Sequence, residues 1–305
     1  MKNYSELSLD REALENCIPL DAPFTVFVEA TNVCNFKCPH CPHGLEDYRQ
    51  QAGYYEAMSM ELFSKLLTGI EELGHIKALK FWLIGEPFLN RHLAEMIRLA
   101  ATAKVADRIE LVSNGSLPME SVLDTGVDYV TISVYDRNEK VLNNVRSLQR
   151  NRGARELTKP LIFARLLTDG DAELEQWFKE HYGQCTDELG FAQKHNWAAT
   201  FEFSDKRPEK HACPYPFYTL AVKANGDVVP CCVAWDKALT VGTLREQTLA
   251  EIWRGAPLRD LQRAHLDHQR NSVKFCANCD VLNLAPDNID NLSLAEFERR
   301  LQSSK

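Results

Sequence analysis

The chain has 305 residues, of which 45% are hydrophobic, and carries a formal net charge of -8 at pH 7. This length is enough for one large domain, or for a barrel-sized domain with a small appendage, around a real hydrophobic core. The acidic balance argues against a general nucleic-acid binder, because such proteins contact phosphates through many Lys and Arg side chains.

No apolar run of about 18 residues occurs, and the N-terminus is polar and acidic where a signal peptide would be basic and then apolar. We therefore expect a cytoplasmic protein without a membrane partner. The chain contains ten cysteines. In a cytosolic protein of this size they predict metal ligands or reactive thiols rather than disulfides.

Short β-rich apolar runs alternate with amphipathic helical patterns between residues 24 and 205. This alternation is typical of repeated βα units around a parallel sheet. Ser59 and Asn90 are the predicted N-caps of two of the helices, which cover 59–73 and 90–103. The pattern predicts an α/β fold, a partial (β/α)6 barrel, with six strands at 24–30, 76–84, 108–113, 128–134, 161–167 and 198–203.

The pattern changes after about residue 204, where several prolines interrupt the chain. A β-hairpin is predicted to turn at Asn225-Gly226, and two short helices are expected at 248–255 and 256–265. A last helix near 293–302 is expected to pack back on the barrel. The predicted organisation is an N-terminal extension (1–23), the barrel (24–205), a small auxiliary module (206–285) and a C-terminal helix (286–305).

Cys34, Cys38 and Cys41 directly follow the first predicted strand, with three and then two residues between them. Three soft thiolates suit an iron–sulfur cluster. A cubane with three protein ligands leaves one iron open, much as catalytic metal sites keep an open position. The residues also allow a zinc site that adds His40 or His43 as a ligand.

The stretch CNFKCPHC resembles the CxxxCxxC signature of the radical S-adenosylmethionine (SAM) superfamily. The resemblance covers about residues 24–205 and implies SAM bound at the open iron of a 4Fe-4S cluster. It also implies reductive cleavage of SAM to methionine and a 5′-deoxyadenosyl radical, which abstracts a hydrogen atom from a small-molecule substrate. The implied electron donor is a flavodoxin- or ferredoxin-like protein.

Further positions match the superfamily in order along the chain. Gly85-Glu86-Pro87 resembles its GGE motif, in which a carboxylate and backbone carbonyls receive the SAM ammonium, although Ile84 replaces the first Gly. Small polar residues end the third and fourth predicted strands, where the superfamily contacts the ribose and carboxylate of SAM. The implied SAM-binding residues are His40, Gly85, Glu86, Ser113, Asn114 and Ser133.

Four further cysteines are Cys213, Cys231, Cys276 and Cys279, two of them flanking the predicted hairpin and two in a CxxC pair. Four converging thiolates form a closed site for zinc or for a 4Fe-4S cluster. The spacing resembles the start of the SPASM auxiliary-cluster domain. No cysteine follows Cys279, so the resemblance implies the shortened, or twitch, form with one auxiliary cluster and two 4Fe-4S clusters in all.

A barrel with a one-cluster module in so short a chain resembles the aminocyclitol dehydrogenases of the superfamily. This implies an oxidoreductase that oxidises a secondary alcohol of a small carbohydrate or aminocyclitol, with the auxiliary cluster accepting an electron. The alternatives are a sugar epimerase with a Cys hydrogen donor, a peptide-modifying SPASM maturase and a zinc-stabilised binding module. About 23 residues before the first strand argue against the maturase, because they are too few for a folded leader-binding domain.

Three residues outside the ligand sets are candidate catalytic groups. Arg165 is a charge in an apolar strand and needs a partner, which would be SAM, a substrate hydroxyl that it helps to deprotonate, or a structural salt bridge. Tyr135 follows the fourth strand and is a candidate hydroxyl-binding residue. Cys232 adjoins a cluster ligand and is a candidate hydrogen-atom donor, an alternative ligand or an inert buried thiol.

Overall fold

The computed structural model describes residues 12–202 and 209–303. Six parallel strands of the first part lie side by side in the order β6-β5-β4-β3-β2-β1. The predicted α/β fold with a parallel sheet is therefore confirmed. The strand bounds are Thr25–Val28 (β1), Ile76–Phe81 (β2), Ala106–Ser113 (β3), Tyr129–Val134 (β4), Leu161–Leu167 (β5) and Glu188–Ala192 (β6).

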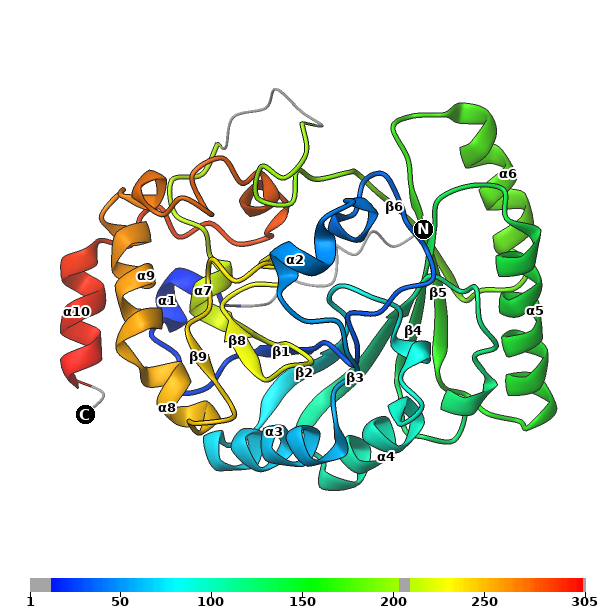
Figure 1. Ribbon diagram of the computed structural model, residues 1–305, viewed down its shortest axis with the longest axis horizontal. Coiled ribbons are helices and arrows are strands. Elements are labelled where there is room, and N and C mark those ends of the chain that lie inside the picture. The colour runs from blue at the N-terminus through cyan, green and yellow to red at the C-terminus, as the bar shows by residue number, and fades with distance from the viewer. Residues whose placement is uncertain (1–11, 203–208, 304–305) are drawn as a thin grey trace.

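Helices cover the outer side of this curved sheet (Figure 1). Leu79 and Phe81 of β2 lie in the main core, whereas Lys80 between them forms an ion pair with Glu110 of β3. Side chains alternate between the two faces of a strand, so the opposite, concave face carries polar groups. The covering helices are α3 (Met60–Leu73), α4 (Leu93–Ala103), α5 (Glu139–Ala154) and α6 (Ala172–Tyr182), whereas the short α2 (Tyr48–Ala52) packs against Ile84 and Trp235.

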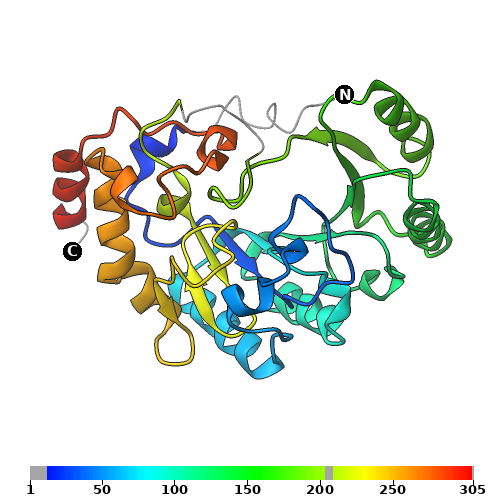
Figure 2. The same cartoon turned by 45° about the horizontal axis from the view of Figure 1, so that its top comes forward.

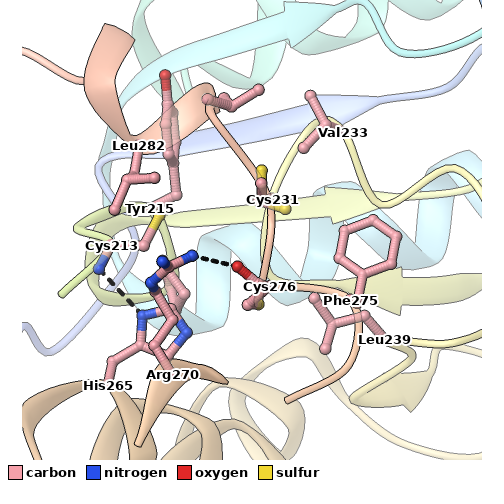
Figure 3. A pocket seen from close by; sticks show the side chains of 13 residues that line it. Cys213, Tyr215, Cys231, Val233, Leu239, His265, Arg270, Phe275, Cys276 and Leu282 are labelled. Carbon is pink, nitrogen blue, oxygen red and sulfur yellow. Dashed lines mark hydrogen bonds between the residues drawn. The ribbon is translucent and has the colours of Figure 1, made fainter. Parts of the chain in front are cut away.

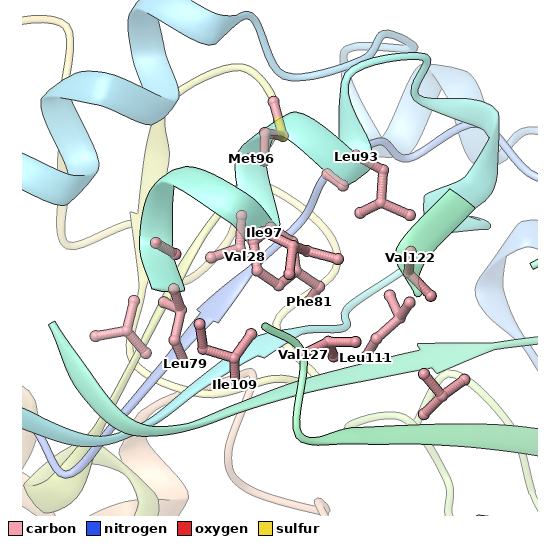
Figure 4. Close-up of a cluster of buried hydrophobic side chains, with 14 of the residues drawn as sticks. Val28, Leu79, Phe81, Leu93, Met96, Ile97, Ile109, Leu111, Val122 and Val127 are labelled. Atoms are coloured by element: carbon pink, nitrogen blue, oxygen red, sulfur yellow. The ribbon is translucent and has the colours of Figure 1, made fainter. Parts of the chain in front are cut away.

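The contact between α4 and the sheet shows how the core forms. Leu93, Met96, Ile97 and Ala100 are the buried residues of this helix. Their spacing places them on one helical face, and Figure 4 shows this face directed toward Phe81 and its neighbours in the sheet. Burial of such large apolar side chains stabilises the layer by about 1.5–3 kcal/mol each.

The predicted strand at 198–203 is wrong. Ala198 and Ala199 have φ values of 55° and 64°, which an extended strand cannot contain, and residue 203 lies outside the described residues. The sixth strand is Glu188–Ala192, which is only partly covered by other residues. An edge strand of this kind does not require the apolar pattern by which the other strands were predicted.

One of the two predicted helix caps is confirmed. The Ser59 side chain accepts a hydrogen bond from the Leu62 N–H at the start of α3. The cap at Asn90 is wrong, because α4 begins at Leu93 after His92. The buried Asn90 amide instead donates to the Ala30 carbonyl at 2.7 Å and fixes the chain that leaves β1.

The C-terminal part continues the same sheet, because β7 (Thr219–Val222) pairs in parallel with β1. The predicted hairpin is confirmed, since β7 and β8 (Asp227–Val229) pair in antiparallel fashion around Gly226 at φ 95°. A short β9 (Gly242–Thr243) completes the nine-stranded sheet. The barrel and the C-terminal module are therefore joined edge to edge by backbone hydrogen bonds.

The last helix does not pack on the barrel as expected. Phe297 of α10 (Leu294–Ser303) contacts Phe217 and lies in a separate core with α1 (Leu14–Cys17). Figure 2 shows α9 and α10 at one end of the molecule and α5 and α6 at the other. The two predicted helices before it are confirmed as α8 (Leu249–Arg254) and α9 (Ala256–Leu266), and α7 (Tyr215–Tyr218) precedes β7.

Over residues 12–202 and 209–303, no helix has both the length and the apolar character that crossing a bilayer requires.

Candidate active site

The loop after β1 brings three thiols together. Cys41 interacts electrostatically with both Cys38 and Cys34, and its N–H donates to the Cys38 carbonyl at 3.1 Å. Gly44 closes this loop, because a Cβ there would lie 2.4 Å from the Cys38 carbonyl oxygen. Burial raises the pKa of Cys38 to about 11 and that of Cys41 to about 12. A bound metal would compensate this cost, since metal ligation replaces the thiol proton.

The histidines of this loop do not complete a zinc site. Among the described residues, no three His, Cys, Asp or Glu side chains converge on the position of a single metal ion. His43 is buried, and neither of its ring nitrogens has a described hydrogen-bond partner. Its ring packs between Tyr48 and Tyr55, with centroids 4.7 and 6.0 Å away. Three thiols without a fourth protein donor fit a cluster with one open iron.

A polar network joins the ends of β2 and β3 to the thiol loop. The Glu86 carboxylate is 1% exposed and accepts hydrogen bonds from the Ser113 hydroxyl at 2.9 Å and the Asn114 N–H at 2.7 Å. The Asn114 side chain in turn donates to Cys34 Sγ at 3.8 Å and to the side-chain Oδ1 of Asn35 at 3.0 Å. Asn114 thus contacts Cys34 directly, and Glu86 and Ser113 are linked to it through the same network.

Burial raises the pKa of Glu86, and the hydrogen bonds from Asn114, Phe88 and Ser113 lower it in part. The carboxylate already accepts three hydrogen bonds within the protein. A carboxylate offers about four lone-pair sites, so one remains for a donor such as the SAM ammonium. Glu86 therefore organises the loop in addition to any contact with SAM.

Gly85 permits the close approach of this loop to the chain after β1. Its φ is 91°, and a Cβ there would lie 2.2 Å from the Thr31 carbonyl oxygen. The next residue, Glu86, donates its N–H to the Val33 carbonyl at 2.9 Å. A glycine is required here by both the backbone conformation and the lack of space. Ile84, which replaces the first Gly of the GGE motif, is buried among Tyr48 and Trp235.

The predicted catalytic residues of the barrel lie on the concave side, near the thiol loop. Ser133 of β4 pairs in register with Arg165 of β5, and its hydroxyl is hydrogen-bonded to Tyr135. The Tyr135 ring lies 4.9 Å from the His40 ring, and its phenol interacts electrostatically with Cys38 and Arg165. The strands therefore bring His40, Ser133, Tyr135 and Arg165 together beside the first thiol group.

Two residues of this region were not found from the sequence. His195 interacts with Arg165 and His40, and burial, followed by these two charges, lowers its pKa to about 4. Trp197 donates its indole N–H to the His40 carbonyl at 2.9 Å. Both belong to the irregular chain after β6, where neither a motif nor a periodic pattern marks them.

The second thiol group lines one cavity beneath the C-terminal helices (Figure 3). Cys231 interacts electrostatically with Cys213, Cys276 and Cys279, and all four thiols border the cavity. Burial raises the pKa of each thiol, that of Cys276 to about 12. The other lining groups are mostly apolar side chains. A closed four-thiol site of this type suits a metal cluster that has no open position.

Cys232 lies beside the second thiol group. It is 7% exposed and packs in a core with Phe27, beside Trp82 of the barrel. Burial raises its pKa to about 12, and it interacts with Arg165 and with the ligand candidate Cys279. The adjacent Cys231, rather than Cys232, faces the cavity with the other three thiols. Cys232 is therefore placed near the concave face.

Two family models match the chain. The model of the radical SAM superfamily matches residues 28–157, and the model of an iron–sulfur cluster-binding domain, SPASM, matches residues 213–280. The matched segments contain both groups of thiols, and together they cover more than half of the chain.

Two curated relatives are similar over most of their length. One is the S-adenosyl-L-methionine-dependent 2-deoxy-scyllo-inosamine dehydrogenase of Niallia circulans, which is 20% identical over 83% of this chain and 91% of its own. The other is the PqqA peptide cyclase of Granulibacter bethesdensis, which is 21% identical over 78% of this chain and 75% of its own.

Solved structures share the fold. BtrN in complex with AdoMet and 2-DOIA superposes with a TM-score of 0.60 at 16% identity, covering 84% of this chain and 92% of that one. The enzyme anSMEcpe with bound AdoMet gives a TM-score of 0.57 at 15% identity, covering 92% of this chain and 94% of that one. The cofactors that these domains imply are SAM and 4Fe-4S clusters. The chain belongs to the radical SAM superfamily, with a SPASM iron–sulfur cluster-binding domain after its barrel.

Proposed function

We propose that the chain is an oxidoreductase that oxidises a secondary alcohol of a small carbohydrate or aminocyclitol. The observation that carries this proposal is that Tyr135 interacts electrostatically both with Cys38 of the first thiol group and with Arg165. Cys232 interacts with Arg165 and with Cys279 of the second thiol group. The similarity to an aminocyclitol dehydrogenase supports the same type of reaction.

The proposed cofactor sites follow from the thiol groups. Cys34, Cys38 and Cys41 would hold a 4Fe-4S cluster with one open iron, and four further thiols would hold the auxiliary cluster. When bound, SAM and the first cluster supply the radical that takes the carbinol hydrogen, and the auxiliary cluster takes up one electron. A flavodoxin- or ferredoxin-like protein is the proposed electron donor. The auxiliary ligands are Cys213, Cys231, Cys276 and Cys279, and the SAM contacts are His40, Gly85, Glu86, Ser113, Asn114 and Ser133.

The residues of the concave face would handle the substrate hydroxyl. Burial raises the pKa of Tyr135, so its phenol stays protonated and can donate a hydrogen bond to the substrate oxygen. The Arg165 guanidinium would stabilise the negative charge on that oxygen as the hydroxyl proton passes to solvent water. Arg165 also lies over the Trp82 ring at 5.6 Å, which limits its movement.

The direct test is anaerobic incubation of the reconstituted protein with SAM, a reductant and candidate sugars or aminocyclitols. We expect 5′-deoxyadenosine to form faster with the true substrate, together with an equal amount of a ketone. Arg165→Lys keeps the charge, and Arg165→Met removes it. We expect the Met variant to lose about 100-fold or more in kcat, as for loss of one oxyanion donor. Equal activity of the Met variant would remove Arg165 from the mechanism.

The epimerase alternative predicts a different isotope result. If Cys232 returned a hydrogen atom, turnover in deuterated water would place solvent deuterium on the product carbon. For the proposed dehydrogenation we expect no such deuterium, and we expect Cys232→Ala to form ketone at a similar rate. Carbon-bound deuterium that disappears in Cys232→Ala would contradict dehydrogenation and support epimerisation.

Peptide modification is a second candidate function, because a peptide cyclase is among the similar proteins. It would be supported if 5′-deoxyadenosine formation rose with a peptide and not with any hydroxylated small molecule. Metal analysis of anaerobically purified protein tests the cofactor sites separately. We expect about eight iron atoms per chain, as for two 4Fe-4S clusters, and about half of this in Cys276→Ala.

A further inference from the structure

Two nitrogen-bearing side chains line the auxiliary-cluster cavity beside the four thiols (Figure 3). His265 comes from α9 and is fully buried, at 0% exposure. Arg270 comes from the short 3-10 helix Arg270–Ser272 and is 7% exposed. The cavity is otherwise lined by thiols, apolar side chains and Tyr215. No Asp or Glu is among the described residues that line it.

The hydrogen bonds of His265 define its tautomer. Its Nδ1 accepts the N–H of Cys213 at 3.0 Å, so this nitrogen carries no proton. The ring N–H is therefore at Nε2. Among the described residues that line the cavity, Nε2 of His265 is the buried side-chain nitrogen without a hydrogen-bond partner. A buried donor without a partner is unfavourable, which indicates a missing acceptor at this site.

Arg270 adds a positive charge to the same wall. Its guanidinium donates to the carbonyl of Cys276 and interacts electrostatically with Cys213, Cys276 and Cys279. Asp280 also interacts with Cys279, but its carboxylate accepts the N–H of Asn196 at 3.0 Å. Arg270 is thus the charged side chain that borders the cavity itself.

We propose that His265 and Arg270 set the reduction potential of the auxiliary cluster, His265 by donating Nε2–H to a cluster or cysteinyl sulfur and Arg270 by its charge. Both effects favour the reduced cluster, which carries one more negative charge, and therefore raise the potential. A higher potential makes the cluster a better acceptor for the electron released by alcohol oxidation. This inference rests on the proposed function for the ligand set and the role of the cluster.

The test measures the potential without turnover. In the full chain with Cys34, Cys38 and Cys41 replaced by Ala, the auxiliary cluster is the one remaining iron centre, and its reduction is followed by electron paramagnetic resonance at controlled potentials. His265→Asn keeps an acceptor for the Cys213 N–H, but its shorter side chain places no donor at the position of Nε2. His265→Gln places an N–H near the position of Nε2.

We expect reduction to become about tenfold less favourable in His265→Asn, a shift of about 59 mV to lower potential for a one-electron couple. His265→Gln should recover most of this shift. Arg270→Gln should lower the potential by a similar amount, and Arg270→Lys should stay near the unsubstituted value. The four variants are expected to keep four iron atoms per chain, as for one 4Fe-4S cluster.

Unchanged potentials in His265→Asn and Arg270→Gln at full iron content would overturn the proposal. Loss of iron in both His265 variants would overturn it as well, because His265 would then be a ligand. The proposed function fails by a different result, the lack of ketone from any alcohol. The shifts of potential described above would remain measurable in that case.

Discussion

Gly85 is the residue at which the loop after β2 meets the chain after β1. In Gly85→Ala, the new Cβ would lie 2.2 Å from the Thr31 carbonyl oxygen, at a φ of 91°. Both the contact and the left-handed conformation are unfavourable, and strain of this kind costs about 1–3 kcal/mol. We expect the variant to unfold at lower urea concentration and to bind SAM more weakly, as measured by denaturation and by equilibrium dialysis.

Gly153 provides the matched control for this substitution. It lies in α5, and nothing is within 4 Å of the Cβ that an alanine would add. Alanine is favoured over glycine inside a helix by about 1 kcal/mol, so Gly153→Ala should be slightly more stable than the original chain. Equal stability of the two variants would show that the close approach at Gly85 has no energetic importance.

The residues that a cofactor requires were predictable where chemistry fixes both residue type and spacing. The three thiols at Cys34, Cys38 and Cys41 are of this kind, because a cubane accepts few other ligands. His265 and Arg270 carry no such signal. They reach the second thiol group only after α9 folds against β7 and β8, and many sequences could place a nitrogen there. The sequence therefore predicts ligands better than the groups around them.

At the scale of elements, β6 is the edge strand that sequence patterns did not find. Asp187, just before it, holds its position through two links. The Asp187 carboxylate accepts the Ile162 N–H of β5 at 2.6 Å. It also pairs with Arg152 of α5, whose guanidinium donates to the Oδ1 of Asp187 at 2.9 Å. Burial opposes ionisation, but the hydrogen bonds from Arg152 and Ile162 outweigh it and hold the pKa of Asp187 below its usual value.

Asp187→Asn should therefore destabilise the protein in a pH-dependent manner. We expect the free energy of unfolding to fall by about 1 kcal/mol at pH 7. This is less than the value for a fully buried hydrogen bond to a charged group, because the Asp187–Arg152 pair is partly exposed. Because the pKa of Asp187 is lower in the folded protein than in the unfolded chain, where it is about 4, the carboxylate stabilises the fold above that pH. This stabilisation is lost as the pH falls through the pKa of the folded state. The difference between the two proteins in urea unfolding should thus shrink below about pH 4.

Asp124→Asn is the control, because Asp124 pairs with Arg155 at an exposed site, 2.7 Å apart. Exposed pairs contribute about 0–1 kcal/mol, so we expect a smaller loss there. Any loss of clusters in acid would affect all three proteins alike. A loss in Asp187→Asn that is independent of pH would contradict the role of its charge.

The errors among the predicted elements share a physical cause. Periodicity identifies helices and strands that bury one face, such as α3 and β4. It fails for β6, which is only partly covered, and for the apolar run after it, which turns through Ala198 and Ala199 in the left-handed conformation. It also fails at Asn90, whose amide is used to fix a loop instead of capping a helix.

At the scale of the whole molecule, the two cofactor-binding parts share one sheet and meet where two buried ionisable residues, Glu29 and Lys223, interact electrostatically. Glu29, at the end of β1, accepts the N–H of Ala224 at 2.9 Å and a hydrogen bond from Tyr54. Lys223, at the end of β7, is 1% exposed and donates to the carbonyl of Asp236. Burial lowers the pKa of Lys223, and the charge of Glu29 opposes this effect.

This junction predicts strong coupling between the barrel and the SPASM domain. Glu29→Gln or Lys223→Met alone removes one of the two interacting groups and leaves the other buried without it, so we expect each to destabilise the protein. The double variant leaves neither charge and should cost clearly less than the sum of the two. Urea unfolding of the four proteins measures this difference, and all four should unfold in one transition, because β1 and β7 belong to the same sheet. Additive costs, or two separate transitions, would mean that the two domains are stabilised independently, and the continuous sheet would then not couple the cofactor sites.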